Sequence, residues 1–133
     1  RAAAEKIADA RIAQRGVLAF TGELREGGDG AVLLDAVLGK HEAIDYMVVL
    51  DRRATVRFVE ILAYRESYGG EVRGAAWRRQ FHGLSPRDLP APERNVMNLS
   101  GATLSCRHVT EGVRKLLAVA AVYATELGLE TAP

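Results

Sequence analysis

The sequence predicts an α+β fold in which a curved antiparallel sheet packs against one long C-terminal helix, with a second helix at the N-terminus. Apolar residues alternate with other residues in two runs between 44 and 64, as in a pair of strands. Between 105 and 127 they recur at three- and four-residue spacing, as in an amphipathic helix. With 133 residues, 48% of them hydrophobic, we expect residues 1–133 to form a single domain with one core.

The first half of the chain predicts a helix followed by strands. Residues 1–16 are rich in Ala, Glu, Lys and Arg and predict a helix that ends near Gly16. A turn cluster of glycines and one Asp at 27–30 separates the apolar stretches 17–20 and 31–38, which predicts a hairpin or a pair of short strands. The charged turn at 51–53 separates the two alternating runs, so we expect an antiparallel meander there.

The second half predicts a loop, a short helix, an irregular segment and the long helix. A loop with a double glycine at 68–71 precedes a short amphipathic helix over 74–82. Three prolines between 86 and 92 keep the chain extended and irregular as far as Asn95. A short β-like stretch over 96–99 then leads into a helix expected from Ser105 to about Leu127.

Composition excludes several classes of function. Eighteen Lys and Arg stand against 17 Asp and Glu, so the net charge of +1 gives no basic surplus for nucleic-acid binding. No apolar run reaches the roughly 18 residues that a spanning helix needs, and we expect a water-soluble domain. The single cysteine, Cys106, and three scattered histidines offer no disulfide framework and no metal site. A P-loop, a dinucleotide fingerprint and a nucleophile elbow are all missing, which argues against kinases and hydrolases.

Small and hydroxyl residues gather where the long helix is expected to begin: Ser100, Gly101, Ala102, Thr103, Leu104 and Ser105. Such residues can cap the free N–H groups of the first helical turn, or leave those groups and the helix dipole to meet an anion such as phosphate. Both interpretations are open at this stage. Cys106 follows directly. The dipole is expected to lower its pKa, but a lone cysteine in a first helical turn is interpreted as a small packed residue rather than as a reactive thiol.

This segment resembles the signature of the FMN-binding domain family. That module is shared by the C subunit of the sodium-translocating NADH:quinone reductase, the G subunit of the Rnf complex and nitrous-oxide regulatory membrane proteins. The family pattern has a strand, a Glu-centred glycine loop and a short helix. Similar features occur in this chain at residues 61–72, at Trp77 and in the Gln-Phe-His-Gly at 80–83. The stretches 38–42 and 106–113 resemble its single-domain branch, so the similarity covers roughly residues 30–125.

The resemblance implies a flavin attached at the last threonine of the signature, Thr103. In the family a flavin transferase esterifies this residue with FMN. The family's usual Asp, six residues upstream, is Met97 in this chain, with Asn98 next to it. Covalent FMN, non-covalent FMN and a domain without flavin are therefore three alternatives.

The glycine loop supplies the other candidate cofactor-binding residues: Tyr64, Arg65, Glu66, Gly69, Gly70 and Glu71. Like Tyr68, these residues follow a strand, as the walls of ligand pockets often do, although a surface Arg-Glu pair beside a turn is an equal alternative. Trp77 and Phe81 share a helix face and are interpreted as core residues. The arginines at 73, 78 and 79 are interpreted as a solvated surface.

The sequence thus leads to two main functional hypotheses and leaves a third open, an accessory subunit that is recognised through its long helix. The first is an FMN-binding electron-transfer module that carries electrons rather than transforming a substrate of its own. The second is a non-enzymatic binding or regulatory domain of the same fold that takes FMN loosely or not at all. The resemblance further implies an exported, periplasmic or membrane-facing location, possible association with a membrane complex, and a redox partner whose identity the sequence does not give.

Overall fold

The computed structural model describes residues 17–24 and 28–131, and the predicted N-terminal helix over 1–16 lies outside this range. Four antiparallel strands form one sheet in the order β1-β2-β3-β4, which confirms the hairpin and the meander. The elements in chain order are β1 (Leu18–Glu23), β2 (Asp29–Leu38), β3 (Ala43–Asp51), β4 (Val56–Tyr64), the 3-10 helix η1 (Gly70–Arg73), α2 (Ala75–Arg78), the 3-10 helix η2 (Arg79–Phe81) and α3 (Thr103–Val122).

The alternation seen in the sequence sets which face of the sheet is buried. Along β3 the residues Ile44, Tyr46, Val48 and Leu50 have no exposed surface. Because successive side chains of a strand point to opposite faces, these four share the face that carries α3. Leu33 of β2 pairs with Val48 and is also fully buried, so the register joins neighbouring strands into one core face.

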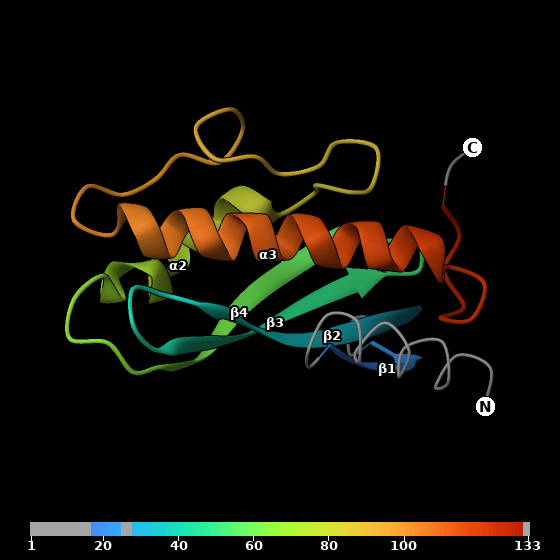
Figure 1. Cartoon of the computed structure of the whole chain (residues 1–133). Coiled ribbons are helices and arrows are strands. Elements are labelled where there is room, and N and C mark those ends of the chain that lie inside the picture. Colours follow the sequence, from blue (N-terminus) through green and yellow to red (C-terminus); the bar gives the residue numbers. More distant parts are fainter. Residues whose placement is uncertain (1–16, 25–27, 132–133) are drawn as a thin grey trace.

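Helix α3 crosses this face, and the segment between η2 and α3 runs along the other side of the helix (Figure 1). The helix buries an apolar stripe at helical spacing, formed by Cys106, Val109, Val113, Leu116, Leu117 and Ala120. Trp77 and Phe81 complete the core with an edge-to-face ring contact at a centroid distance of 5.3 Å. This confirms that both aromatic residues serve packing.

Two predicted boundaries near α3 are wrong. The helix begins at Thr103 and ends at Val122, whereas the pattern predicted Ser105 to about Leu127. The apolar spacing continues beyond the helix because the turns after Val122 bury Leu127, which is only 3% exposed. The β-like stretch over 96–99 is not a strand, since Val96 forms only an isolated bridge with Pro92.

Arg78 also differs from its prediction as a solvated residue. Its guanidinium donates to the Val59 carbonyl at 2.6 Å and pairs with Glu60 at 3.1 Å, and its side chain is only 16% exposed. The arginine therefore ties α2 to β4. Arg73 and Arg79 are exposed, as predicted.

A polar contact that the sequence did not reveal fixes α3 to the sheet. The buried Asp35 on β2 accepts a hydrogen bond from the Tyr46 hydroxyl at 2.9 Å and pairs with Lys115 of α3 at 2.7 Å. Burial, followed by the Asp35 charge, raises the pKa of Tyr46. Gly112 makes room for this contact, because a Cβ there would lie 2.4 Å from the Tyr46 hydroxyl. The middle of α3 is thus held in a defined position over the sheet.

Within the described residues, none of the helices combines the length and the apolar character that crossing a bilayer demands.

Candidate functional site

A cavity of about 610 Å³ opens where the loop after β4 meets the start of α3. Its lining comes from three separate parts of the chain, residues 40–42, 65–69 and 101–105. The volume lies within the range of small-molecule sites, roughly 300–1,000 Å³. The cavity joins the two segments that the sequence analysis singled out, although more than 30 residues separate them.

The structure brings most of the predicted site residues to this cavity, but not all of them. Those that line it are Arg65, Glu66, Gly69, Gly101, Ala102, Thr103, Leu104 and Ser105. Four predicted residues lie outside the lining: Ser100, Tyr64, Gly70 and Glu71. Tyr64 adjoins the lining, and its hydroxyl contacts Ser105 and the Tyr68 carbonyl, so it supports the loop.

Sequence reasoning missed four lining residues, which are Lys40, His41, Glu42 and Ser67, whereas Tyr68 was already expected in a pocket wall. The signal for the first three was present, because the stretch 38–42 already resembled the family pattern. What was not visible is that the β2–β3 connection reaches the same end of the sheet as the loop after β4. Antiparallel pairing of Ile44 with Tyr64 produces this arrangement.

The start of α3 leaves its first backbone amides without a cap. The N-cap residue is Ala102, which has no side-chain cap hydrogen bond, and the first amide bonded in helical fashion is that of Cys106, to the Ala102 carbonyl at 2.9 Å. Within the described residues, the amides of 103–105 have no hydrogen-bond partner. Of the two interpretations of this segment, side-chain capping is therefore wrong, and the free amides and the positive end of the dipole lie at the cavity.

The hydroxyl groups near this helix start make other contacts. Thr103 is exposed, and its hydroxyl makes only a long contact, 3.5 Å, to the Leu99 carbonyl. The Ser105 hydroxyl lies 3.0 Å from the Tyr64 hydroxyl, and Tyr64 also donates to the Tyr68 carbonyl. Thr103 consequently presents a nearly unengaged hydroxyl, while Ser105 links α3 to the loop after β4.

Cys106 is buried, which confirms its interpretation as a packed residue rather than a reactive thiol. The thiol is fully buried, and burial raises its pKa above the ordinary value, although a contact from the Leu99 amide opposes this. The expectation of a lowered pKa is wrong, because burial raises it and the nearby charges of Glu71 and Glu93 add to that effect. Cys106 is a packed core residue.

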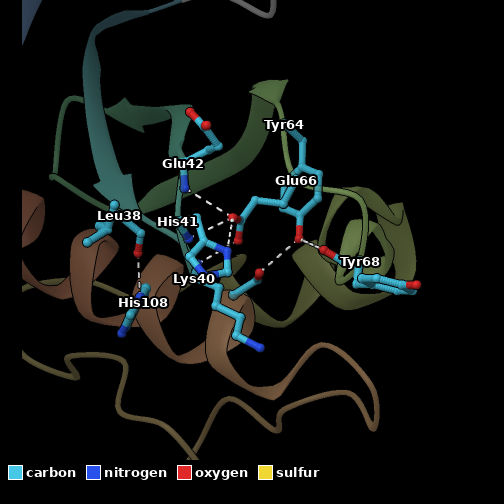
Figure 2. A network of polar contacts seen from close by, with 9 residues as sticks. Leu38, Lys40, His41, Glu42, Tyr64, Glu66, Tyr68 and His108 are labelled. Atoms are coloured by element: carbon cyan, nitrogen blue, oxygen red, sulfur yellow. Dashed lines mark hydrogen bonds and ion pairs between the residues drawn. The ribbon is translucent and has the colours of Figure 1, made fainter.

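Glu66 organises one wall of the cavity. Its carboxylate accepts hydrogen bonds from three consecutive amides, those of Lys40 at 2.6 Å, His41 at 2.6 Å and Glu42 at 3.0 Å (Figure 2). The side chain is only 8% exposed, and the His41 ring lies 3.6 Å away. Burial raises the pKa of this carboxyl, but the three amide bonds together with His41 outweigh it and hold the pKa below its ordinary value. Glu66 therefore fixes the 40–42 turn.

We expect Glu66→Gln to loosen this turn. Because the carboxyl pKa is lower in the folded state, its contribution to stability is present above the unfolded value, about 4.3, and is lost as pH falls through the folded value. In the parent, the amide proton shifts of residues 40–42 should therefore titrate together, at a pH below the ordinary range of a glutamate carboxyl. In Glu66→Gln that titration should vanish, and these amides should exchange with solvent roughly tenfold faster or more at neutral pH. NMR measures both. Unchanged amide titration in the variant would contradict the assignment.

Gly69 occupies the closest approach between the loop and α3. Its φ is +84°, and a Cβ there would lie 2.4 Å from the Tyr64 hydroxyl and 2.9 Å from that of Ser105. Gly70 is less constrained, because a Cβ there would meet only the flexible Arg73 side chain, at 3.1 Å. The first glycine of the pair is thus the one that the backbone geometry requires.

Arg65 lies on the other rim of the cavity. Its guanidinium donates to the Ala43 carbonyl at 2.8 Å and pairs with Asp45 at 2.7 Å. The Arg-Glu surface pair considered from the sequence is not formed, since Arg65 and Glu66 each bind the β2–β3 connection or β3 instead. Among the described residues, no cluster of three or more His, Cys, Asp or Glu could hold a metal ion.

Comparison with protein-family models matches residues 39–118 to the FMN-binding domain. The matched region is more than half of the chain and contains all three segments that line the cavity. This confirms the resemblance that the sequence motifs suggested. A search of curated proteins gives no match.

Proposed function

Because this chain belongs to the FMN-binding domain family, we propose that it is an electron-transfer module that holds FMN in the cavity between the loop after β4 and the start of α3. The observation that carries the proposal is the uncapped first turn of α3, whose residues 103–105 line a cavity of about 610 Å³. Bound flavin would supply the redox chemistry by accepting and passing on electrons. The residues of the chain supply binding, orientation and electrostatic tuning.

The chemistry of the donor groups fits a phosphate at the helix start. Three free amides and the positive end of a 20-residue helix favour an anion at this position. Thr103 is exposed beside them, and its hydroxyl is the proposed ester oxygen. In the attachment step the Thr103 oxygen forms a bond to phosphorus and loses its proton, while the bond between phosphorus and the leaving group of the flavin donor breaks. A flavin transferase is the proposed catalyst.

The remaining walls suit the flat ring of the cofactor. The loop 65–69 and the turn 40–42 stand on the other sides of the cavity and are joined by Glu66. Gly69 permits the close approach of this loop to α3. Because the Glu66 carboxylate accepts three amide hydrogen bonds that favour its charged form, it provides a fixed negative charge on this side, and such a charge affects the redox potential of a nearby flavin.

The proposal is tested by intact mass and visible absorption of the protein co-expressed with a flavin transferase. We expect an added mass equal to FMN less one water and the absorption of oxidised flavin. Non-covalent FMN would give the flavin absorption of the native protein, but the denatured chain would have its unmodified mass. The absence of both signals would favour the second candidate, a regulatory or binding domain of the same fold that takes FMN loosely or not at all.

Met97 is the feature that favours that second candidate. It stands where the family pattern has Asp, and its main chain is held on both sides: its amide donates to Gln80 at 2.8 Å, and its carbonyl accepts from Trp77 at 2.7 Å. The Met97 side chain itself is 43% exposed. An aspartate at this position would therefore project to the surface without disturbing the core.

We expect Met97→Asp to raise the fraction of protein that carries covalent FMN, if the missing acid limits recognition by the transferase. The change is exposed, so stability should alter by no more than about 0.5 kcal/mol. Intact mass after co-expression measures the modified fraction. Val122→Asp is the matched control, because Val122 is an exposed apolar residue, 73% accessible, at the far end of α3. A complete adduct already present in the parent would show that this chain does not need the acid.

A further inference from the structure

Tyr68 is a large, exposed aromatic side chain at the cavity. It lines the cavity, yet 86% of its surface is exposed to solvent. Apart from His41, it is the only ring among the lining residues of the described chain. An aromatic side chain left in water forgoes the free energy of burial, so such a residue at a cavity mouth suits a partner that covers it.

The backbone of Tyr68 is fixed while its side chain is free. Its carbonyl accepts a hydrogen bond from Tyr64, whose hydroxyl also contacts Ser105 of α3. The next residue, Gly69, holds the left-handed conformation against α3. Figure 2 shows the Tyr68 ring turned away from the Glu66 carboxylate. Rotation about the side-chain bonds can therefore bring the ring over the cavity without moving the loop.

We propose that Tyr68 is the stacking residue for the isoalloxazine ring, closing over the flavin from an anchored backbone. The inference rests on the proposed function and adds to it the residue that contacts the ring. Offset stacking between a phenol and the flat, electron-poor flavin contributes dispersion and shields the ring from water. Contact with a phenol also quenches flavin emission, because an electron passes from the phenol to the excited flavin and returns without net chemistry.

The test compares Tyr68→Leu, Tyr68→Trp and the parent, each carrying FMN after co-expression with a flavin transferase. Absorption and intact mass first give the flavin content of each protein. Per bound flavin, we expect emission to rise several-fold in Tyr68→Leu and to stay quenched in Tyr68→Trp, which keeps an aromatic electron donor. Iodide should quench the emission of Tyr68→Leu more strongly than that of the parent, because the flavin ring in this variant is open to solvent.

Tyr123→Leu is the matched control. Tyr123 lies just beyond the last residue of α3, at the end of the helix away from the cavity, so its removal should leave the emission per flavin at the parental value. Equal emission and equal iodide quenching in Tyr68→Leu and the parent, at equal flavin content, would overturn the stacking role and leave the FMN site standing. A parent without any flavin would overturn both the stacking role and the proposed function.

Discussion

Replacing Thr103 with alanine is expected to abolish covalent FMN while leaving the fold intact. Thr103 is exposed, and its hydroxyl makes only a 3.5 Å contact to the Leu99 carbonyl, so the structure loses little when the oxygen is removed. We expect the free energy of unfolding to change by less than about 1 kcal/mol. The added mass of the flavin should fall from its parental fraction to zero. Intact mass and denaturant unfolding measure the two effects.

Two further variants make this result specific. Thr103→Ser keeps a hydroxyl at the helix start and should keep an adduct, at lower yield. Ser105→Ala removes a hydroxyl that is engaged with Tyr64 rather than free, so covalent flavin should persist there. An adduct that survived in Thr103→Ala would place the attachment at another residue. It would also show that the position of the free amides of α3 does not determine which hydroxyl group is esterified.

The positions of the elements were largely predictable because short-range patterns determine them. The alternation from Ile44 to Leu50 predicted β3, and the recurrence from Val109 to Ala120 predicted α3. The end of α3 was not predictable in this way, since Leu127 is buried by a turn and so continues the apolar pattern beyond Val122. Periodicity records which residues are buried, and helical hydrogen bonding can stop before burial does.

The site was predictable only as two separate segments. Motif resemblance pointed to the loop after β4 and to the segment 100–105, and the structure places most of their residues at one cavity. What Glu66 does could not be read from the sequence, because its partners are backbone amides 24 to 26 positions away. Backbone amides carry no sequence signature. The same holds for the missing cap, since nothing in the sequence shows that Ala102, rather than a neighbouring serine, takes the N-cap position.

Gly69→Ala is expected to give the largest loss of stability among the changes considered, and to reduce flavin content with it. The substitution places a side chain in the left-handed region, at φ +84°, which costs roughly 1–2 kcal/mol. The new Cβ would also lie 2.4 Å from the Tyr64 hydroxyl, so the tyrosine must move and release Ser105 and the Tyr68 carbonyl. Overpacking of this kind adds about 1–3 kcal/mol.

Gly83→Ala separates the two contributions. Gly83 has nearly the same backbone conformation, φ +86°, but a Cβ there meets nothing within 4 Å, so this variant carries the cost of the left-handed conformation alone. Denaturant unfolding should therefore show Gly69→Ala to be less stable than Gly83→Ala by the overpacking contribution, and only Gly69→Ala should lose covalent or bound flavin. Equal unfolding free energies in the two variants would mean that the Tyr64 side chain moves away from the new Cβ without a loss of stability. The contact between the loop and α3 would then not be what holds the cavity in shape, and the flavin content of Gly69→Ala should equal that of the parent.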